Sequence, residues 1–146
     1  MPRNPWLIAA GMLSAGAALL HLAIIAGGPD WYRFFGAGER MARMAERGLL
    51  RPTLITLGIA AILALWAAYA FAGAGLIRRL PLMRTALVAI TCIYLLRGLA
   101  LGPLLVFRPQ TVNAFALWSS LIVLVYGIVH AVGTRRAWPA LSVTAR

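Results

Sequence analysis

The chain contains few charged residues, and hardly any of them are acidic. Only 12% of its 146 residues are charged, 3 are Asp or Glu, all 14 basic residues are arginine, and Cys92 is the one cysteine. A soluble domain needs roughly 25% charged residues to cover its surface, so this composition excludes a soluble globular enzyme. The 62% apolar content excludes a disordered segment. A single cysteine excludes a secreted disulfide scaffold.

What the chain has instead is four long apolar runs. Each run is long enough to cross a bilayer core of about 30 Å at about 1.5 Å per helical residue. Continuous apolar runs form helices, because a barrel strand would alternate apolar and polar residues. The sequence therefore predicts an all-α fold, an integral membrane four-helix bundle that forms a single domain over residues 1–146. The predicted spans are residues 6–27, 53–74, 85–107 and 113–132.

The net charge of +11 would suggest a nucleic-acid partner in a soluble protein. Here the arginines stand at the ends of apolar runs, where they contact lipid headgroups, so we expect membrane lipids as partners and no nucleic acid. Arginine without lysine, together with abundant Ala, Gly, Leu and Pro, indicates a GC-rich bacterial genome and hence a bacterial cytoplasmic (inner) membrane. Both termini are predicted to be cytoplasmic, because the second loop and the C-terminal flank are purely basic.

The first loop, residues 28–52, contains every acidic residue of the chain and four aromatic residues. Loops of this length are either functional or disordered, and the aromatic residues favour an ordered one. The segment Glu39–Leu50 predicts a short amphipathic helix, because Glu39 and Arg43 are spaced i to i+4 and an apolar stripe begins at Met41. We expect this helix to lie in the membrane surface.

Arg97 is the most informative residue, because it lies near the middle of the third predicted span. A charge at that depth costs roughly 2.5 to 3.5 kcal/mol and normally turns toward a partner or a water-filled cavity. No Asp or Glu occurs in any predicted span. Three partners therefore stay open: an acid from the first loop, an anionic ligand, or neutral acceptors on neighbouring helices.

Seven residues make up the predicted ligand site. Tyr94 shares a helix face with Arg97, since side chains lean toward the helix N-terminus. In the fourth span Tyr126 follows Ser119 by seven residues and so lies on the same stripe. His21 lies in the outer half of the first span, where an acid lowered from the loop would meet it. The predicted ligand-binding residues are Arg97, His21, Tyr94, Tyr126, Ser119, Glu39 and Asp30.

No cofactor or metal is expected. His21 and His130 lie on opposite sides of the predicted midplane, too far apart to bind one haem or one metal ion. Cys92 has no histidine on its helix face, and the sequence contains no CxxC motif, glycine-rich phosphate loop or pair of carboxylates within the spans. The sequence therefore provides no catalytic residue set.

Small residues recur at helix-packing intervals. Ala60, Ala64, Ala68 and Ala72 are four residues apart in the second span, and the third span contains Gly98 and Gly102 as a GxxxG pair. Both patterns let helix backbones approach closely. We expect them to pack within the bundle, with a homo-oligomer interface as the alternative.

Three functions follow as hypotheses. The leading one is binding or carriage of a lipid-like or anionic small molecule in a polar pocket around Arg97. The second is a membrane-embedded enzyme acting on a lipid, thiol or quinone, in which His21 and Glu39 transfer protons and therefore share a cavity. The third is a structural or assembly subunit of a membrane complex. The first is preferred because it gives the central arginine a role.

Overall fold

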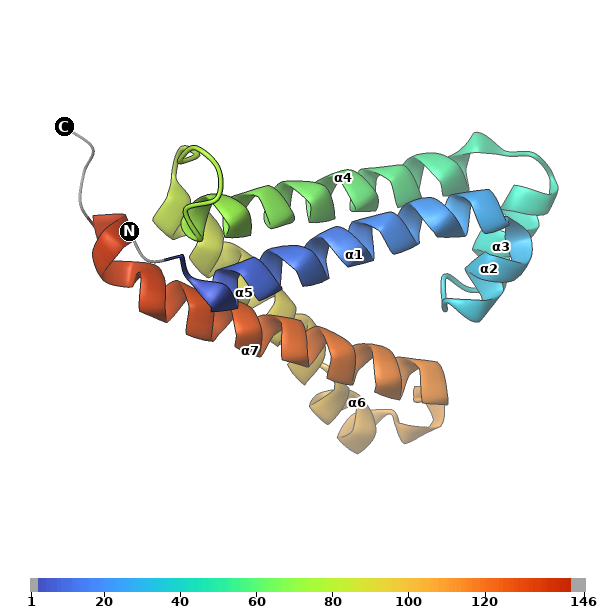
Figure 1. Ribbon diagram of the computed structural model, residues 1–146. Helices are drawn as coiled ribbons and strands as arrows, with labels where there is room; N and C mark the ends of the chain where they lie inside the picture. The colour runs from blue at the N-terminus through green and yellow to red at the C-terminus, as the bar shows by residue number, and fades with distance from the viewer. Residues whose placement is uncertain (1–2, 143–146) are drawn as a thin grey trace. The chain divides into compact units, whose positions relative to one another are not determined.

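The computed structural model describes residues 3–142, and within them every regular element is a helix (Figure 1). The elements are α1 (Pro5–Gly27), α2 (Pro29–Phe34), α3 (Glu39–Glu46), α4 (Leu50–Gly73), α5 (Met83–Leu99), α6 (Leu101–Phe107), the 3-10 helix η1 (Pro109–Thr111) and α7 (Ala114–Ser142).

In the described part of the chain, four stretches are long and apolar enough to cross a membrane: Pro5–Gly27, Leu50–Gly73, Met83–Phe107 and Ala114–Leu141. The protein is therefore a small polytopic membrane protein with four candidate spans, and the predicted all-helical class is confirmed. The largest difference from the predicted bounds is at α7, which continues beyond Val132 through Arg135 and Arg136. A helix does not have to end where its apolar run ends, because arginine and alanine are strong helix formers.

The chain divides into two compact units. The loop unit consists of Ser14–Leu65 and includes α2 and α3. The bundle unit consists of the described residues up to Leu13 together with those from Trp66 onward. Each unit is described by itself below.

The bundle unit contains the core in which all four long helices meet. Leu7 of α1 and Leu87 of α5 are fully buried, and they pack with Ala70 of α4 and Ala137 of α7 in one apolar cluster. Small residues permit this packing: a side-chain carbon at Gly133 of α7 would lie 2.8 Å from the side chain of Leu7. The four long helices therefore form a bundle here, as predicted.

Helices α5 and α7 lie side by side in this unit (Figure 1). A side-chain carbon at Gly98 of α5 would stand 2.7 Å from the backbone of Leu124, and one at Gly127 of α7 would stand 2.9 Å from the backbone of Leu95. Glycine is therefore required on both helices for this approach. Gly98 packs against α7 within the chain, as expected. A side-chain carbon built at Gly102 would have no atom of the described residues within 4 Å.

The third span is broken, although the sequence predicts one continuous helix over residues 85–107. α5 ends at Leu99 and α6 begins at Leu101, with Ala100 between them. Pro103 explains the break, because proline has no backbone N–H for the carbonyl of Leu99 and its ring crowds that carbonyl.

In the loop unit, the helix predicted over residues 39–50 is present as the shorter α3, and α2 is an additional helix that the sequence does not predict. Tyr32 of α2 and Ala42 of α3 are buried and pack with Ile24 of α1. The helix α3 ends at Glu46, since Gly48 adopts a φ of 70° and its backbone N–H donates to the carbonyl of Ala45. This glycine-ended turn satisfies the last carbonyls of the helix.

Candidate functional site

Arg97 lies in the last turn of α5, directly before the break in the third span. Its side chain is exposed, and its Nη1 donates to the Oγ of Ser120 on α7 over 3.2 Å. Ser120 itself is buried. Within residues 3–142, Arg97 forms no ion pair with a carboxylate. The guanidinium therefore has a neutral partner and occupies an open position instead of a closed cavity.

An aromatic cluster stands one turn from Arg97 in the same unit. Tyr94 is buried, and its ring centroid lies 4.9 Å from that of Trp66, 5.6 Å from that of Tyr126 and 5.0 Å from that of His130. The Trp66 and Tyr126 rings meet Tyr94 edge to face, an arrangement that stabilises aromatic pairs by about 0.5 to 1.5 kcal/mol. Two predicted site residues, Tyr94 and Tyr126, are thus in contact, and Arg97 follows Tyr94 by one turn on α5.

His130 is the most buried polar side chain of this cluster. It is 0% exposed, and its Nδ1 lies 2.9 Å from the carbonyl oxygen of Tyr126. Because only a protonated Nδ1 can donate to that oxygen, the other ring nitrogen, Nε2, is the acceptor in the neutral ring. Nε2 has no hydrogen-bond partner among the described residues.

The residue that contacts Arg97 on α7 is Ser120, whereas the residue predicted from the sequence is Ser119. Ser119 donates its hydroxyl to the carbonyl of Ala116 on its own helix over 3.3 Å. One signal in the sequence does identify Ser120: Gly127 follows it by two helical turns, and glycine marks the face of α7 that meets α5.

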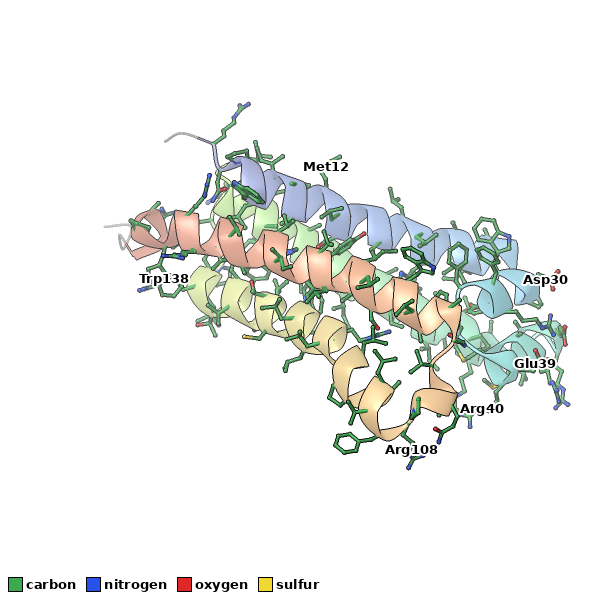
Figure 2. All side chains as sticks on the ribbon, turned by 90° about the horizontal axis from the view of Figure 1, so that it is seen from below. Met12, Asp30, Glu39, Arg40, Arg108 and Trp138 are labelled. Carbon is green, nitrogen blue, oxygen red and sulfur yellow. The ribbon has the colours of Figure 1, made fainter. Side chains whose placement is uncertain are left out.

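The acidic residues of the loop unit gather around Arg33. Two of them, Asp30 and Glu39, are labelled in Figure 2. Its guanidinium lies 3.1 Å from Asp30, 2.9 Å from Glu39 and 2.6 Å from Glu46, and Arg43 lies 3.0 Å from Glu39. The hydrogen bonds from Arg33, and next those from Arg43, lower the pKa of Glu39 to about 2. The hydrogen bonds to Glu39 and Glu46 raise the pKa of Arg33. All three acids of the chain are therefore ion-paired.

The remaining predicted site residues belong to the loop unit. Asp30 and Glu39 bind Arg33, as described above. His21 is half-buried on α1, and its Nδ1 lies 2.8 Å from the carbonyl oxygen of Ala17, one turn earlier. The other four predicted residues belong to the bundle unit, so the structure divides the seven into two sets. These four are Tyr94, Arg97, Ser119 and Tyr126.

No family model, curated protein or solved structure matches this chain. The described part of the chain contains no group of three or more His, Cys, Asp or Glu side chains that could hold a metal ion. What these residues offer chemically is a cation at membrane depth beside aromatic rings and hydroxyl groups.

Proposed function

We propose that this membrane protein binds an anionic, lipid-like small molecule at Arg97, with Ser120, Tyr94 and Tyr126 completing the site. The observation that carries the proposal is a guanidinium within a candidate span whose hydrogen-bond partner is a neutral hydroxyl group. A carboxylate or phosphate ligand would supply the missing counter-charge and accept two parallel hydrogen bonds from the arginine.

The charge distribution of the chain supports an external partner for Arg97. The three acids, Asp30, Glu39 and Glu46, all pair with Arg33. Moving one of them to Arg97 would break a hydrogen-bonded ion pair, whereas a bound anion would leave that cluster intact. An arginine within the hydrocarbon region, at a cost of roughly 2.5 to 3.5 kcal/mol, gains most from a partner of opposite charge.

The break at Ala100 supports a polar opening at the same place. Pro103 leaves the carbonyl of Leu99 without its helical donor, two residues beyond Arg97. Irregular backbone at membrane depth is tolerated where it is covered by protein or lines a water-filled cavity. A carbonyl without its usual helical donor and a guanidinium together favour access for water and for the head of an amphipathic molecule.

The aromatic cluster supports the lipid-like part of the ligand. The rings of Trp66 and Tyr126 pack against Tyr94, which precedes Arg97 by one helical turn, and the hydroxyl group of a tyrosine adds a polar end. A site with an apolar wall and one cation matches a molecule with an apolar body and one anionic group.

The ion pairs of Glu39 argue against the proton-transfer enzyme. With a pKa of about 2, Glu39 remains ionised at neutral pH, because Arg33 and Arg43 stabilise the carboxylate. A group that transfers protons efficiently has a pKa near the working pH. No observation favours catalysis by His21 with Glu39 over binding at Arg97.

Oleate, a carboxylate with an apolar chain, is the probe for this site, and oleyl alcohol is its uncharged analogue. We expect the purified protein to bind oleate at least about tenfold more tightly than oleyl alcohol in native mass spectrometry, since a charge-assisted bond contributes roughly 1.5 to 3 kcal/mol. Arg97→Gln should remove this preference, and Arg97→Lys should retain part of it.

Arg108→Gln is the matched control, because it removes the same charge from an exposed residue at the end of the third span. It should leave the preference for oleate unchanged. An equal loss in the Arg97 and Arg108 variants, or no preference in the wild-type protein, would refute the proposal.

A further inference from the structure

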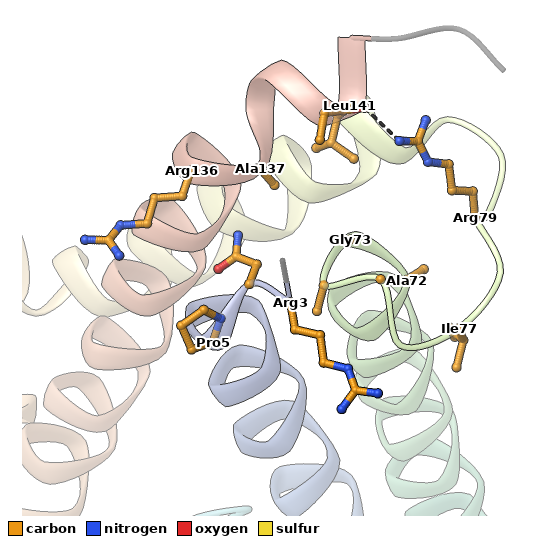
Figure 3. Close-up of a pocket in the computed structure, with 13 residues that line it drawn as sticks. Arg3, Pro5, Ala72, Gly73, Ile77, Arg79, Arg136, Ala137 and Leu141 are labelled. Atoms are coloured by element: carbon orange, nitrogen blue, oxygen red, sulfur yellow. Dashed lines mark hydrogen bonds between the residues drawn. The ribbon is translucent and has the colours of Figure 1, made fainter. Parts of the chain in front are cut away.

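A cleft of about 350 Å³ opens in the bundle unit where the beginning of α1, the end of α4 and the end of α7 meet (Figure 3). Its floor consists of small residues, among them Ala72 and Gly73 of α4 and Ala137 of α7. The cleft exists because alanine and glycine leave space where larger side chains would fill the bundle. Its floor is accordingly apolar.

Three arginines surround this cleft on different sides (Figure 3). Arg79 reaches toward α7, where its Nη2 donates to the carbonyl of Ala140 over 2.7 Å. Arg3 extends between α1 and α4, and Arg136 turns outward from α7. No acidic residue lines the cleft, since every acid of the chain lies between residues 30 and 46. The cleft therefore carries a strong positive charge that no acid among its lining residues neutralises.

Two tryptophans stand at the ends of helices that meet at the cleft, Trp6 in the first turn of α1 and Trp138 near the end of α7. The guanidinium of Arg136 lies 5.4 Å from the ring centroid of Trp6, and that of Arg84 lies 4.1 Å from the ring centroid of Trp138. Tryptophan and arginine together are typical of the headgroup layer, where an amphipathic ring and a cation both have suitable surroundings. The cleft thus opens where phospholipid headgroups lie.

We propose that this cleft binds the phosphodiester headgroup of an anionic phospholipid. Arginine is the preferred side chain for phosphate, because its planar guanidinium offers paired donors. Basic pockets between the ends of membrane helices are suited to anionic headgroups, and the apolar floor suits the glycerol backbone and the first methylene groups. This site is separate from Arg97 and does not depend on the function proposed there.

The test measures lipid binding to the full-length protein in detergent by native mass spectrometry. The probes are phosphatidylglycerol, which is anionic, and phosphatidylcholine, whose choline cation neutralises its phosphate. We expect phosphatidylglycerol to bind at least about tenfold more tightly, since three arginines near an anionic headgroup each strengthen binding by a factor on the order of five. The triple variant Arg3→Gln/Arg79→Gln/Arg136→Gln should reduce this preference to less than about twofold.

A second triple variant separates a site from diffuse positive charge. Arg78→Gln/Arg84→Gln/Arg135→Gln removes the same charge from neighbouring positions that do not line this cleft. This control variant should still bind phosphatidylglycerol more tightly than phosphatidylcholine. Ala140→Leu keeps every charge and narrows the cleft, and we expect it to weaken phosphatidylglycerol binding several-fold while the helical circular dichroism stays at the wild-type value.

Three outcomes would overturn the proposal. The first is that both triple variants lose the preference for phosphatidylglycerol equally. The second is that phosphatidylglycerol binds with wild-type affinity both to Ala140→Leu and to the triple variant of Arg3, Arg79 and Arg136. The third is displacement of phosphatidylglycerol by an equal concentration of inorganic phosphate, which would assign the cleft to free phosphate in place of a lipid.

Discussion

Arg33 forms ion pairs with all three acidic side chains of the chain. Its three carboxylate partners come from α2 and α3, so these ion pairs connect two short helices that bury few apolar side chains. Surface ion pairs contribute little one by one, and a network with a shared guanidinium contributes more than its separate pairs. At the scale of residues, the order of the loop unit should therefore depend on the ionisation of its acids.

This dependence predicts a response to acid. The pKa of Glu39 is about 2 in the folded chain and 4.5 in its ordinary state. The stability that comes from its ionisation is present above about pH 4.5 and is lost as the pH falls through about 2. Amide hydrogen exchange in α3, corrected for its intrinsic rate, should therefore accelerate between pH 4.5 and 2.

Two variants check the origin of this effect. In the Glu39→Gln variant, the amide hydrogens of α3 should exchange faster than in the wild-type protein already at pH 6. Their exchange rate should change less between pH 4.5 and 2. Asp30→Asn removes a largely exposed carboxylate, with 92% of its side chain accessible, and should behave like the wild-type protein. Exchange in α3 that does not change over this pH range in the wild type would contradict the prediction.

At the scale of elements, the contact between α5 and α7 depends on glycine. Gly98→Leu should separate the two helices, because its first side-chain carbon would stand 2.7 Å from the backbone of Leu124. Forcing side chains into a close-packed contact costs about 1 to 3 kcal/mol. The free energy of unfolding, measured in a mixture of detergent and sodium dodecyl sulfate, should therefore fall by about 1 to 3 kcal/mol. The unfolding midpoint should shift to a lower fraction of dodecyl sulfate.

Gly102→Leu is the control for this experiment, since a side chain at residue 102 meets no atom within 4 Å of its first carbon. It should unfold close to the wild-type midpoint. If the two variants lost the same stability, the effect would come from glycine replacement in general and not from the contact of α5 with α7.

The elements also show what the sequence could and could not predict. Hydropathy predicts all four long helices, because a bilayer requires continuous apolar helices. The break at Ala100 could be predicted from Pro103, which cannot donate to the helix. α2 has only six residues, too few for an apolar period, and Pro29 in its first turn is the one local signal.

The candidate site shows a different limit. Arg97 can be found from the sequence, because its charge stands alone in an apolar run. The seven-residue spacing to Tyr126 selects Ser119, whereas the seven-residue spacing to Gly127 selects Ser120, its neighbour by about 100° of rotation. Which of these two stripes meets α5 depends on how the two helices cross. The pairing of Glu39 with Arg33 likewise depends on the turn between α2 and α3.

At the scale of the whole molecule, the spans predict which loops share a side of the membrane. We expect the segment between α4 and α5 to be cytoplasmic and the segment between α2 and α3 to be on the outer side, since the former is purely basic. With Cys92 replaced by alanine, Ala37→Cys should react with a membrane-impermeant maleimide in intact bacterial cells. Ile77→Cys should react only after the cells are permeabilised.

The two cysteine variants also test the number of spans. Both should react fully in permeabilised cells, since residues 37 and 77 are exposed. Reaction of both in intact cells would contradict a single crossing by α4, and the reverse pattern would contradict a cytoplasmic position for the basic loop.

The length of α7 has a consequence for how the protein responds to different bilayers. Its 29 residues extend for roughly 43 Å, more than a hydrocarbon core of about 30 Å, and Arg135 and Arg136 lie inside the helix near its end. A shift of α7 along its axis by one turn toward the bilayer centre would place the guanidinium groups of Arg135 and Arg136 among the acyl chains. This would cost on the order of a few kcal/mol. When the bilayer becomes thinner or thicker, α7 should therefore change its tilt, while Arg135 and Arg136 stay at the same membrane surface.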